Sequence, residues 1–555
     1  MLRLFEQHHV RKVKSLNGSW NFKKTGEATK EYTMIVPSCW EQHPDFSSFR
    51  GEAEYKKEIF ITEKTAGLRL DFKGISHTAD VYFDNQKVAH HYNAYTPFSV
   101  VIPNVDLGSH ELRVVVDNSF NENSALHIPN DYYSYGGITR GVSMELIPNV
   151  FIERIEFTPQ YRDHIWEANI KVFLKNIQQL PTTVTVQIDI AGKVFTRKDL
   201  NINESTSQVV EFNERFFDIE SWSPTNPHLY LLKSHLISDE NVIDDLIERV
   251  GFREVEIRGN KVWINAEEIF LKGFNRHEDY GEFGCAIPLQ LMVHDLDIMQ
   301  DLGANSVRTC HYPNDELFLD LCDERGIMVW EENHARGLSL AEMKNQNFKK
   351  QCENCNREMV ENHYNHPSII IWGILNECAS ETEEGREMYK NQYDQIRSMD
   401  QSRPLTSATC RHFTDICLDL PDIVSFNMYT GWYQDMSVEE RHNQELNWIH
   451  KEGGEGKPII VSEFGAGGIY GYRDRARSKW SEERQVDILT SNLQIYLNDP
   501  RIMGVFIWQF ADCRITEENN WFAARPRSYN NKGIVDEYRR PKMVYSAVKE
   551  YFNKV

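Results

Sequence analysis

Apolar and polar residues alternate in short segments along the first 250 residues, the pattern of β-strands with one buried face. In residues 1–148, turn signals such as Asp84-Asn85 and Leu107-Gly108 separate these segments, and no helical periodicity of comparable length competes with them. We expect residues 1–148 to form a jelly-roll-like sandwich. Residues 149–250, roughly 100 residues with a second alternating pattern, fit an immunoglobulin-like β-sandwich.

The pattern changes at Gly251, where short apolar segments begin to alternate with amphipathic helical segments, as in a parallel α/β fold. Between the apolar segments, apolar residues repeat at helical spacing, for example from Leu289 to Leu296, with Gly303 at the expected C-terminal cap. Eight predicted strands are the number that closes a (β/α)₈ TIM barrel, so we expect one barrel over residues 251–555. The predicted strands are Ile269–Asn275, Ser306–Cys310, Ile327–Glu331, Ile369–Leu375, Leu405–Thr409, Ile423–Met428, Pro458–Ser462 and Gly504–Phe510.

Two of these strands lead directly into a glutamate. The fourth is followed by Asn376-Glu377, and the seventh by Glu463. In such a barrel the carboxyl ends of the strands face the active-site mouth. Two carboxylates delivered there suit hydrolysis of a glycosidic bond, in which one acid protonates the leaving oxygen and the other attacks or activates water. Either glutamate alone could belong to an ion pair, but the two together favour a catalytic pair.

Composition narrows the range of partners and the compartment. The formal net charge of −22 argues against nucleic acid or an anionic membrane as the main partner, so an acidic ligand would need a local cluster of cations. The N-terminus has no apolar signal segment and no later run is long enough to span a bilayer, so we expect a cytoplasmic protein. Nine of the ten cysteines lie after residue 280 with irregular spacing, which indicates reduced thiols.

Two further motifs have a structural interpretation beside a functional one. Cys352 and Cys355 form a lone C-x-x-C, but they fall on the apolar stripe of a predicted helix, and a metal site needs more ligands at matching spacing. His363 and His366 precede the fourth strand, where a helix end and a strand entry explain them better than zinc does. We therefore expect no metal and no cofactor.

Residues 305–313 and 365–377 resemble the two barrel signatures of glycoside hydrolase family 2, and residues 16–20 and 36–40 resemble its sugar-binding domain. The resemblance covers essentially the whole chain. It implies a jelly-roll sandwich, an immunoglobulin-like domain and a catalytic barrel with retaining chemistry.

The resemblance also implies roles for the two glutamates, with Glu463 as the nucleophile and Glu377 as the general acid/base. In a retaining enzyme the two carboxyl groups lie about 5–5.5 Å apart, close enough for one to attack the sugar directly. Repulsion between like charges at that range lets one carboxyl stay protonated near neutral pH while the other is ionised.

The stretch after the eighth strand bears on which sugar is cleaved. Asn530-Asn531-Lys532-Gly533 resembles the Asn-x-Lys motif with which β-glucuronidases of this family hold the C6 carboxylate of glucuronic acid. A neutral hexose could not use the charge of Lys532. The resemblance therefore implies a retaining exo-β-glucuronidase that acts on a small-molecule or oligosaccharide glucuronide, and we expect a homo-oligomer, a dimer or a tetramer. Two alternatives remain, a β-galacturonidase or β-galactosidase on the same scaffold, or a carbohydrate-binding protein without catalysis.

The same resemblance implies further contacts to the sugar. Asn376 is expected to donate to the 2-hydroxyl and Tyr429 to hydrogen-bond the nucleophile. The remaining candidates surround the sugar: Asp131 at a hydroxyl, Tyr433 in the pocket wall, Trp508 as the floor and His311 nearby.

Two features of the sequence depart from what the family resemblance leads us to expect. The segment from His334 to Lys350 is short, which predicts an open mouth, and residues 517–529 form an insert that is longer than expected. That insert carries Arg525 and Arg527, either of which could help to bind the C6 carboxylate of the sugar. We name Arg527 as the candidate, although the sequence does not distinguish the two.

Overall fold

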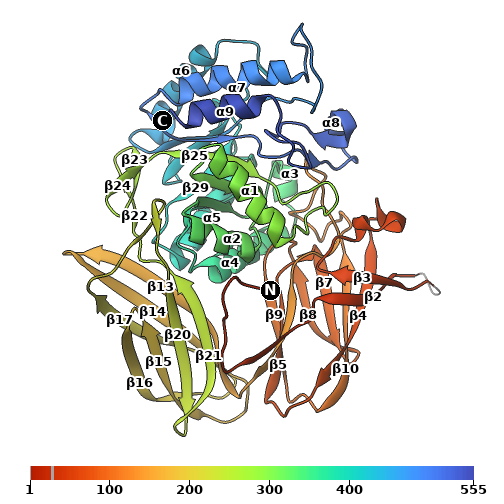
Figure 1. Ribbon diagram of the computed structural model, residues 1–555, viewed down its shortest axis with the longest axis vertical. Coiled ribbons are helices and arrows are strands. Elements are labelled where there is room, and N and C mark those ends of the chain that lie inside the picture. Colours follow the sequence, from red (N-terminus) through yellow and green to blue (C-terminus); the bar gives the residue numbers. More distant parts are fainter. Residues whose placement is uncertain (1, 27–29, 555) are drawn as a thin grey trace.

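The computed structural model describes residues 2–26 and 30–554, which form two β-sandwiches side by side and a barrel that rests on both (Figure 1). In the first sandwich a four-stranded sheet, β1-β12-β5-β9, packs on a six-stranded sheet, β3-β2-β4-β10-β7-β8. Trp20 and Tyr55 from one sheet and Leu70 from the other are buried between them. The strands are β1 Lys12–Ser15, β2 Gly18–Lys24, β3 Tyr32–Val36, β4 Glu52–Ile61, β5 Gly67–Phe72, β7 Thr78–Phe83, β8 Gln86–Tyr92, β9 Phe98–Pro103, β10 Gly108–Asp117 and β12 Val142–Ile147.

The second sandwich pairs a three-stranded sheet, β13-β14-β17, with a four-stranded sheet, β16-β15-β20-β21. Its sequence alternation is explained by burial, because every second side chain of β14, from Trp166 to Leu174, lies in the core. The strands are β13 Val150–Arg162, β14 Ile165–Asn176, β15 Thr182–Ile190, β16 Lys193–Ile202, β17 Ser207–Phe216, β20 Tyr230–Ser238 and β21 Asn241–Val250.

The third unit is a closed barrel of eight parallel strands, as predicted. The strands are β25 Leu271–Arg276, β26 Ser306–Thr309, β27 Met328–Glu332, β28 Ile369–Gly373, β29 Leu405–Thr409, β30 Ile423–Asn427, β31 Ile459–Phe464 and β32 Ile502–Ile507. The helices are α1 Leu289–Asp301, α2 Glu316–Arg325, α3 Leu340–Met343, α4 Phe348–His363, α5 Glu383–Met399, α6 Val438–Ile449, α7 Glu482–Tyr496, α8 Asn520–Ala523 and α9 Val544–Phe552. β31 runs further than expected and includes Glu463 itself, whose partner in β30 is Asn427.

The aromatic loop 131–140 of the first sandwich docks on the barrel. The Tyr135 hydroxyl donates to Asp279 Oδ2 at 2.9 Å, and Arg140 forms a buried ion pair with Glu278 at 2.7 Å. Charge-assisted contacts of this kind hold a defined geometry across the domain boundary. The packing brings the start of the loop to the mouth of the barrel.

The cysteines and histidines flagged by their spacing lie in the interior. All ten cysteines are free thiols, and Cys352 and Cys355 are buried on α4. His363 and His366 contact the carboxylates of Glu331 and Asp323, at 2.8 and 2.6 Å respectively. Among the described residues, no helix has the length and apolar character needed to cross a membrane.

Candidate active site

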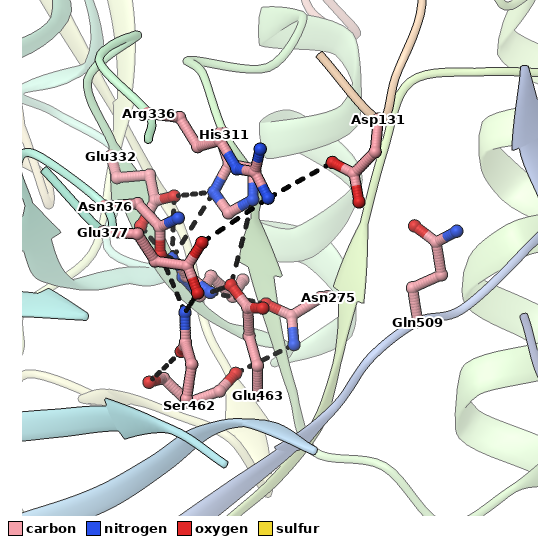
Figure 2. A network of polar contacts seen from close by, with 12 residues as sticks. Asp131, Asn275, His311, Glu332, Arg336, Asn376, Glu377, Ser462, Glu463 and Gln509 are labelled. Atoms are coloured by element: carbon pink, nitrogen blue, oxygen red, sulfur yellow. Dashed lines mark hydrogen bonds and ion pairs between the residues drawn. The ribbon is translucent and has the colours of Figure 1, made fainter. Parts of the chain in front are cut away.

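The carboxyl ends of the barrel strands bring Glu377 and Glu463 to one cavity of about 250 Å³. Glu463 lies within β31 and is 2% exposed. Glu377 follows β28 at a sharp turn, where Leu375 and Glu377 adopt left-handed backbone angles with φ of 46° and 55°. The two carboxylates point toward one another across the cavity (Figure 2).

Glu463 is held by one cation and one hydroxyl. Arg308 Nη1 donates to its Oε1 at 2.9 Å, and the Tyr429 hydroxyl donates to its Oε2 at 2.6 Å. Burial and the charge of Glu377 raise the pKa of Glu463 to about 7, whereas Arg308 and Tyr429 act in the opposite direction. Glu463 can therefore change protonation state near neutral pH.

Glu377 and its neighbour Asn376 make different contacts. Asn427 Nδ2 donates to Glu377 Oε1 at 2.9 Å, and Arg336 lies 3.5 Å from Glu377 Oε2. Asn376 Oδ1 accepts from Arg308 Nη2 at 2.8 Å, which fixes the orientation of the amide. Its buried Nδ2 has no acceptor among the residues that the structure describes. An unpaired buried donor is costly, so this amide is suited to a ligand oxygen.

Lys532 lies in the same cavity, and its side chain is 2% exposed. Its Nζ donates to the Tyr433 hydroxyl at 2.9 Å and lies 5.1 and 5.0 Å from the ring centres of Tyr429 and Tyr433. Within residues 2–26 and 30–554, no carboxylate lies at ion-pair distance from this ammonium group, and both burial and the nearby Arg525 lower the pKa of Lys532. A buried cation without an anionic partner marks a place for an anionic ligand group.

Asp131, from the first domain, contacts the cations that line this cavity besides Lys532, namely Arg336 and Arg525. Its Oδ2 accepts from Arg525 Nη2 at 2.9 Å and from Asn530 Nδ2 at 3.1 Å, and its Oδ1 lies 3.3 Å from Arg336. Burial would raise the pKa of Asp131, but Arg336 and Arg525 lower it to about 2. The carboxylate is therefore ionised and forms ion pairs with two of the cavity's arginines, while Lys532 is not within ion-pair distance of any carboxylate of the described residues.

The structure corrects one predicted site residue. Arg527 does not reach this cavity, because its guanidinium donates to both oxygens of Glu537 at 2.7 and 2.8 Å, next to a separate cavity. Arg525 is the arginine of the insert that lines the site. Arg527 has a φ of 65°, so the backbone turns between the two arginines and directs them to different sides.

Trp508 lines the cavity, while His311 is buried behind it. Their rings stack with centres 5.2 Å apart, and His311 Nδ1 lies 2.7 Å from Glu332 Oε1. Burial and Arg308 lower the pKa of His311 well below its usual range, so the ring is neutral. The neutral ring is then oriented by Glu332, which itself accepts two hydrogen bonds from Arg308.

Arg336 is one of the site residues that the sequence reasoning missed, together with Arg308 and Asn427, which contact the two glutamates. Arg336 lies in the short segment after β27 and bridges Asp131 and Glu377, which belong to different domains. The available signal was a cation closely following the carboxyl end of a barrel strand. This signal is weak, because polar loops contain many cations.

A closed parallel barrel with two facing carboxylates at its strand ends, mounted on two β-sandwiches, is an architecture suited to a glycosidase. Family models agree along the chain: the sugar binding domain of glycosyl hydrolases family 2 matches residues 12–148, the second family 2 domain matches 150–253, and the family 2 TIM barrel domain matches 255–555. The chain belongs to glycoside hydrolase family 2.

Similar proteins differ in the sugar that they are named for. A family 2 β-galacturonidase from Eisenbergiella tayi, solved with galacturonate bound, is 48% identical with a TM-score of 0.97, over 100% of this chain and 99% of that one. A β-glucuronidase from Streptococcus agalactiae is 26% identical over 98% of this chain and 96% of its own length. A β-galactosidase from Thermoanaerobacterium thermosulfurigenes is 28% identical over 96% of this chain and 75% of its own length.

Proposed function

We propose that the protein is a retaining exo-β-uronidase, which removes a terminal β-linked uronic acid, and that galacturonate is its preferred sugar. The observation that carries the uronide class is Lys532, a buried ammonium in the cavity of the two glutamates with no carboxylate at ion-pair distance among the described residues. The C6 carboxylate of a uronic acid would supply the missing anion, with Asn530 and Arg525 nearby.

The two glutamates divide the chemistry of a double displacement. Glu463 attacks the anomeric carbon and forms a glycosyl-enzyme, while Glu377 protonates the glycosidic oxygen of the leaving group. Glu377 then removes a proton from water, which attacks the anomeric carbon and releases Glu463. Asn376, whose Nδ2 has no acceptor among the described residues, would donate to the 2-hydroxyl as charge develops on the ring.

Electrostatic coupling links the protonation of Glu463 to the charge of Glu377. The charge of Glu377 raises the pKa of Glu463, so a proton on Glu377 favours an ionised Glu463, which is the reactive state. Once Glu463 is esterified, Glu377 has given its proton to the leaving group and can act as the base toward water. Arg308 and Tyr429 stabilise the Glu463 carboxylate in the first step.

Replacing Tyr429 with phenylalanine is expected to move the acidic limb of the kcat/KM profile to higher pH. Activity requires ionised Glu463, so kcat/KM falls as the pH drops through the pKa of Glu463, about 7. The Tyr429 hydrogen bond favours the charged form, and losing about 1.5–3 kcal/mol of it raises this pKa by about 1–2 units. An unchanged limb would show that Tyr429 does not tune the nucleophile.

The preference for galacturonate rests on the comparison with solved structures. The β-galacturonidase is 48% identical to this chain, whereas the β-glucuronidase from Streptococcus agalactiae is 26% identical. Galacturonate and glucuronate differ only in the direction of the 4-hydroxyl, so a small change in the polar groups of the cavity can reverse the preference. Glucuronide is therefore the second candidate, because Asn530-Asn531-Lys532-Gly533 resembles a motif of β-glucuronidases and because both sugars carry the C6 carboxylate.

Three nitrophenyl substrates test the proposal side by side. We expect kcat/KM for β-galacturonide to exceed that for β-glucuronide by at least about tenfold, the effect of ~1.4 kcal/mol at one hydroxyl. Both should exceed β-galactoside, which has no carboxylate. Preference for glucuronide would overturn the sugar and keep the uronide class, whereas preference for galactoside would overturn the class.

A further inference from the structure

The insert at residues 517–529 has a second feature besides Arg525. It leaves the two-residue strand β33 (Cys513–Arg514) and returns to β34 (Tyr529–Asn530), which pairs with it. Between them, α8 carries Trp521 and Phe522, and both line the cavity of the two glutamates. This short segment therefore places Arg525 against Asp131 and Trp521 at the same cavity.

Trp521 lies at the outer edge of this site. Its side chain is 67% exposed, and its ring centre lies 6.5 Å from that of Tyr433, itself 48% exposed. Residues deeper in the cavity, such as Glu463 and Lys532, are each 2% exposed. A large aromatic side chain left in solvent beside a functional cavity is a signature of a binding surface.

The size of the cavity sets what can lie against Trp521. Its volume of about 250 Å³ is below the roughly 300–1,000 Å³ of pockets that enclose a drug-sized ligand. With the uronic acid between Glu463 and Lys532, little room remains inside, so the leaving group lies at the rim. His412 and Gln434 line the cavity as well and offer polar contacts to such a group.

We propose that Trp521 is the platform of a leaving-group subsite that binds a ring, either aromatic or sugar, by stacking on the indole. The inference rests on the proposed function and adds the class of the group attached to the uronic acid. An indole presents a broad apolar face with a negative quadrupole, which attracts the C–H groups of a sugar face and the edge or offset face of an aryl ring. A methyl group is too small to cover it.

Three β-uronides of the preferred sugar test this inference: the phenyl uronide, a disaccharide with the uronic acid linked to a hexose, and the methyl uronide. Stacking contacts of this type predict that Trp521→Ala lowers kcat/KM for the ring-bearing substrates, relative to methyl uronide, by about two- to twelvefold. The loss should appear mainly in KM, because the contact is made in both the ground and transition states. Each substrate is compared between variants, so differences in leaving-group reactivity cancel.

Trp521→Phe is expected to recover part of the ratio, since a smaller ring keeps some of the stacking face. Phe217→Ala, which removes an exposed aromatic side chain from the second sandwich, is the matched control and should leave all three substrates unchanged. A loss confined to phenyl uronide would assign the platform to aryl groups, and a loss confined to the disaccharide would assign it to sugars.

Two results would overturn the platform. One is an equal loss on methyl uronide, which would mean that Trp521 acts by supporting Arg525, and the other is no change on either ring-bearing substrate. Failure of the proposed function is a separate result. If the enzyme prefers galactosides, the same ratio measured with phenyl and methyl galactoside still tests Trp521.

Discussion

Glu463→Gln is expected to lower kcat on nitrophenyl galacturonide by on the order of 10⁴-fold or more, the scale of losing a covalent nucleophile. The amide has nearly the same shape as the carboxylate, so the fold should survive, although contacts with Arg308 and Tyr429 weaken. The measurement is steady-state turnover with a thermal-unfolding control. A variant that keeps wild-type turnover would remove Glu463 from the mechanism.

Glu377→Gln gives a different pattern and so separates the two roles. Nitrophenolate leaves without a proton, so forming the glycosyl-enzyme should survive on nitrophenyl galacturonide and fail on methyl galacturonide, whose leaving group needs an acid. Hydrolysis of the intermediate should slow on both substrates because the base is absent. Glu384→Gln on α5, an exposed glutamate paired with Lys344, is the control and should leave both substrates unchanged.

Barrel strands such as β28 and β32 could be predicted because each is an apolar run, long enough for a strand and too short for a helix, whereas β26 and β29 mix apolar and polar residues. All five residues of β28, from Ile369 to Gly373, are buried, as such a run requires. The positions of Glu377 and Glu463 at strand ends follow from the same runs. What could not be predicted is which cations face them, because that depends on barrel closure and on the docking of another domain.

Arg336 and Arg525 illustrate this limit. Both meet at Asp131, which lies more than 200 residues earlier in the chain and reaches the barrel only through the docked loop 131–140. No periodic pattern distinguishes Arg525 from Arg527, since they are two residues apart in an irregular segment. Their different directions follow from the left-handed backbone at Arg527, which sequence propensity does not favour at arginine.

Lys532→Ala is expected to lower kcat/KM on the preferred uronide by about 30- to 5,000-fold, the ~2–5 kcal/mol lost when one partner of a desolvated charge pair is removed. The bound C6 carboxylate would then face Tyr433 and Arg525 without the ammonium group. Lys532→Met keeps most of the volume and separates loss of charge from loss of packing. The matched control is Arg527→Ala, which removes a cation of the same segment that binds Glu537 instead.

A comparison of a charged with a neutral substrate tests whether Lys532 acts on the C6 carboxylate. Nitrophenyl galactoside lacks that group, so its kcat/KM should change little in Lys532→Ala, and an equal loss on both substrates would reduce the lysine to a structural role. A pH series adds an independent measurement. Burial and Arg525 lower the pKa of Lys532, so the ammonium loses its proton at a lower pH than an exposed lysine would. KM for the uronide should therefore rise as pH increases through that pKa, while KM for the galactoside stays flat, because only the uronide depends on the positive charge.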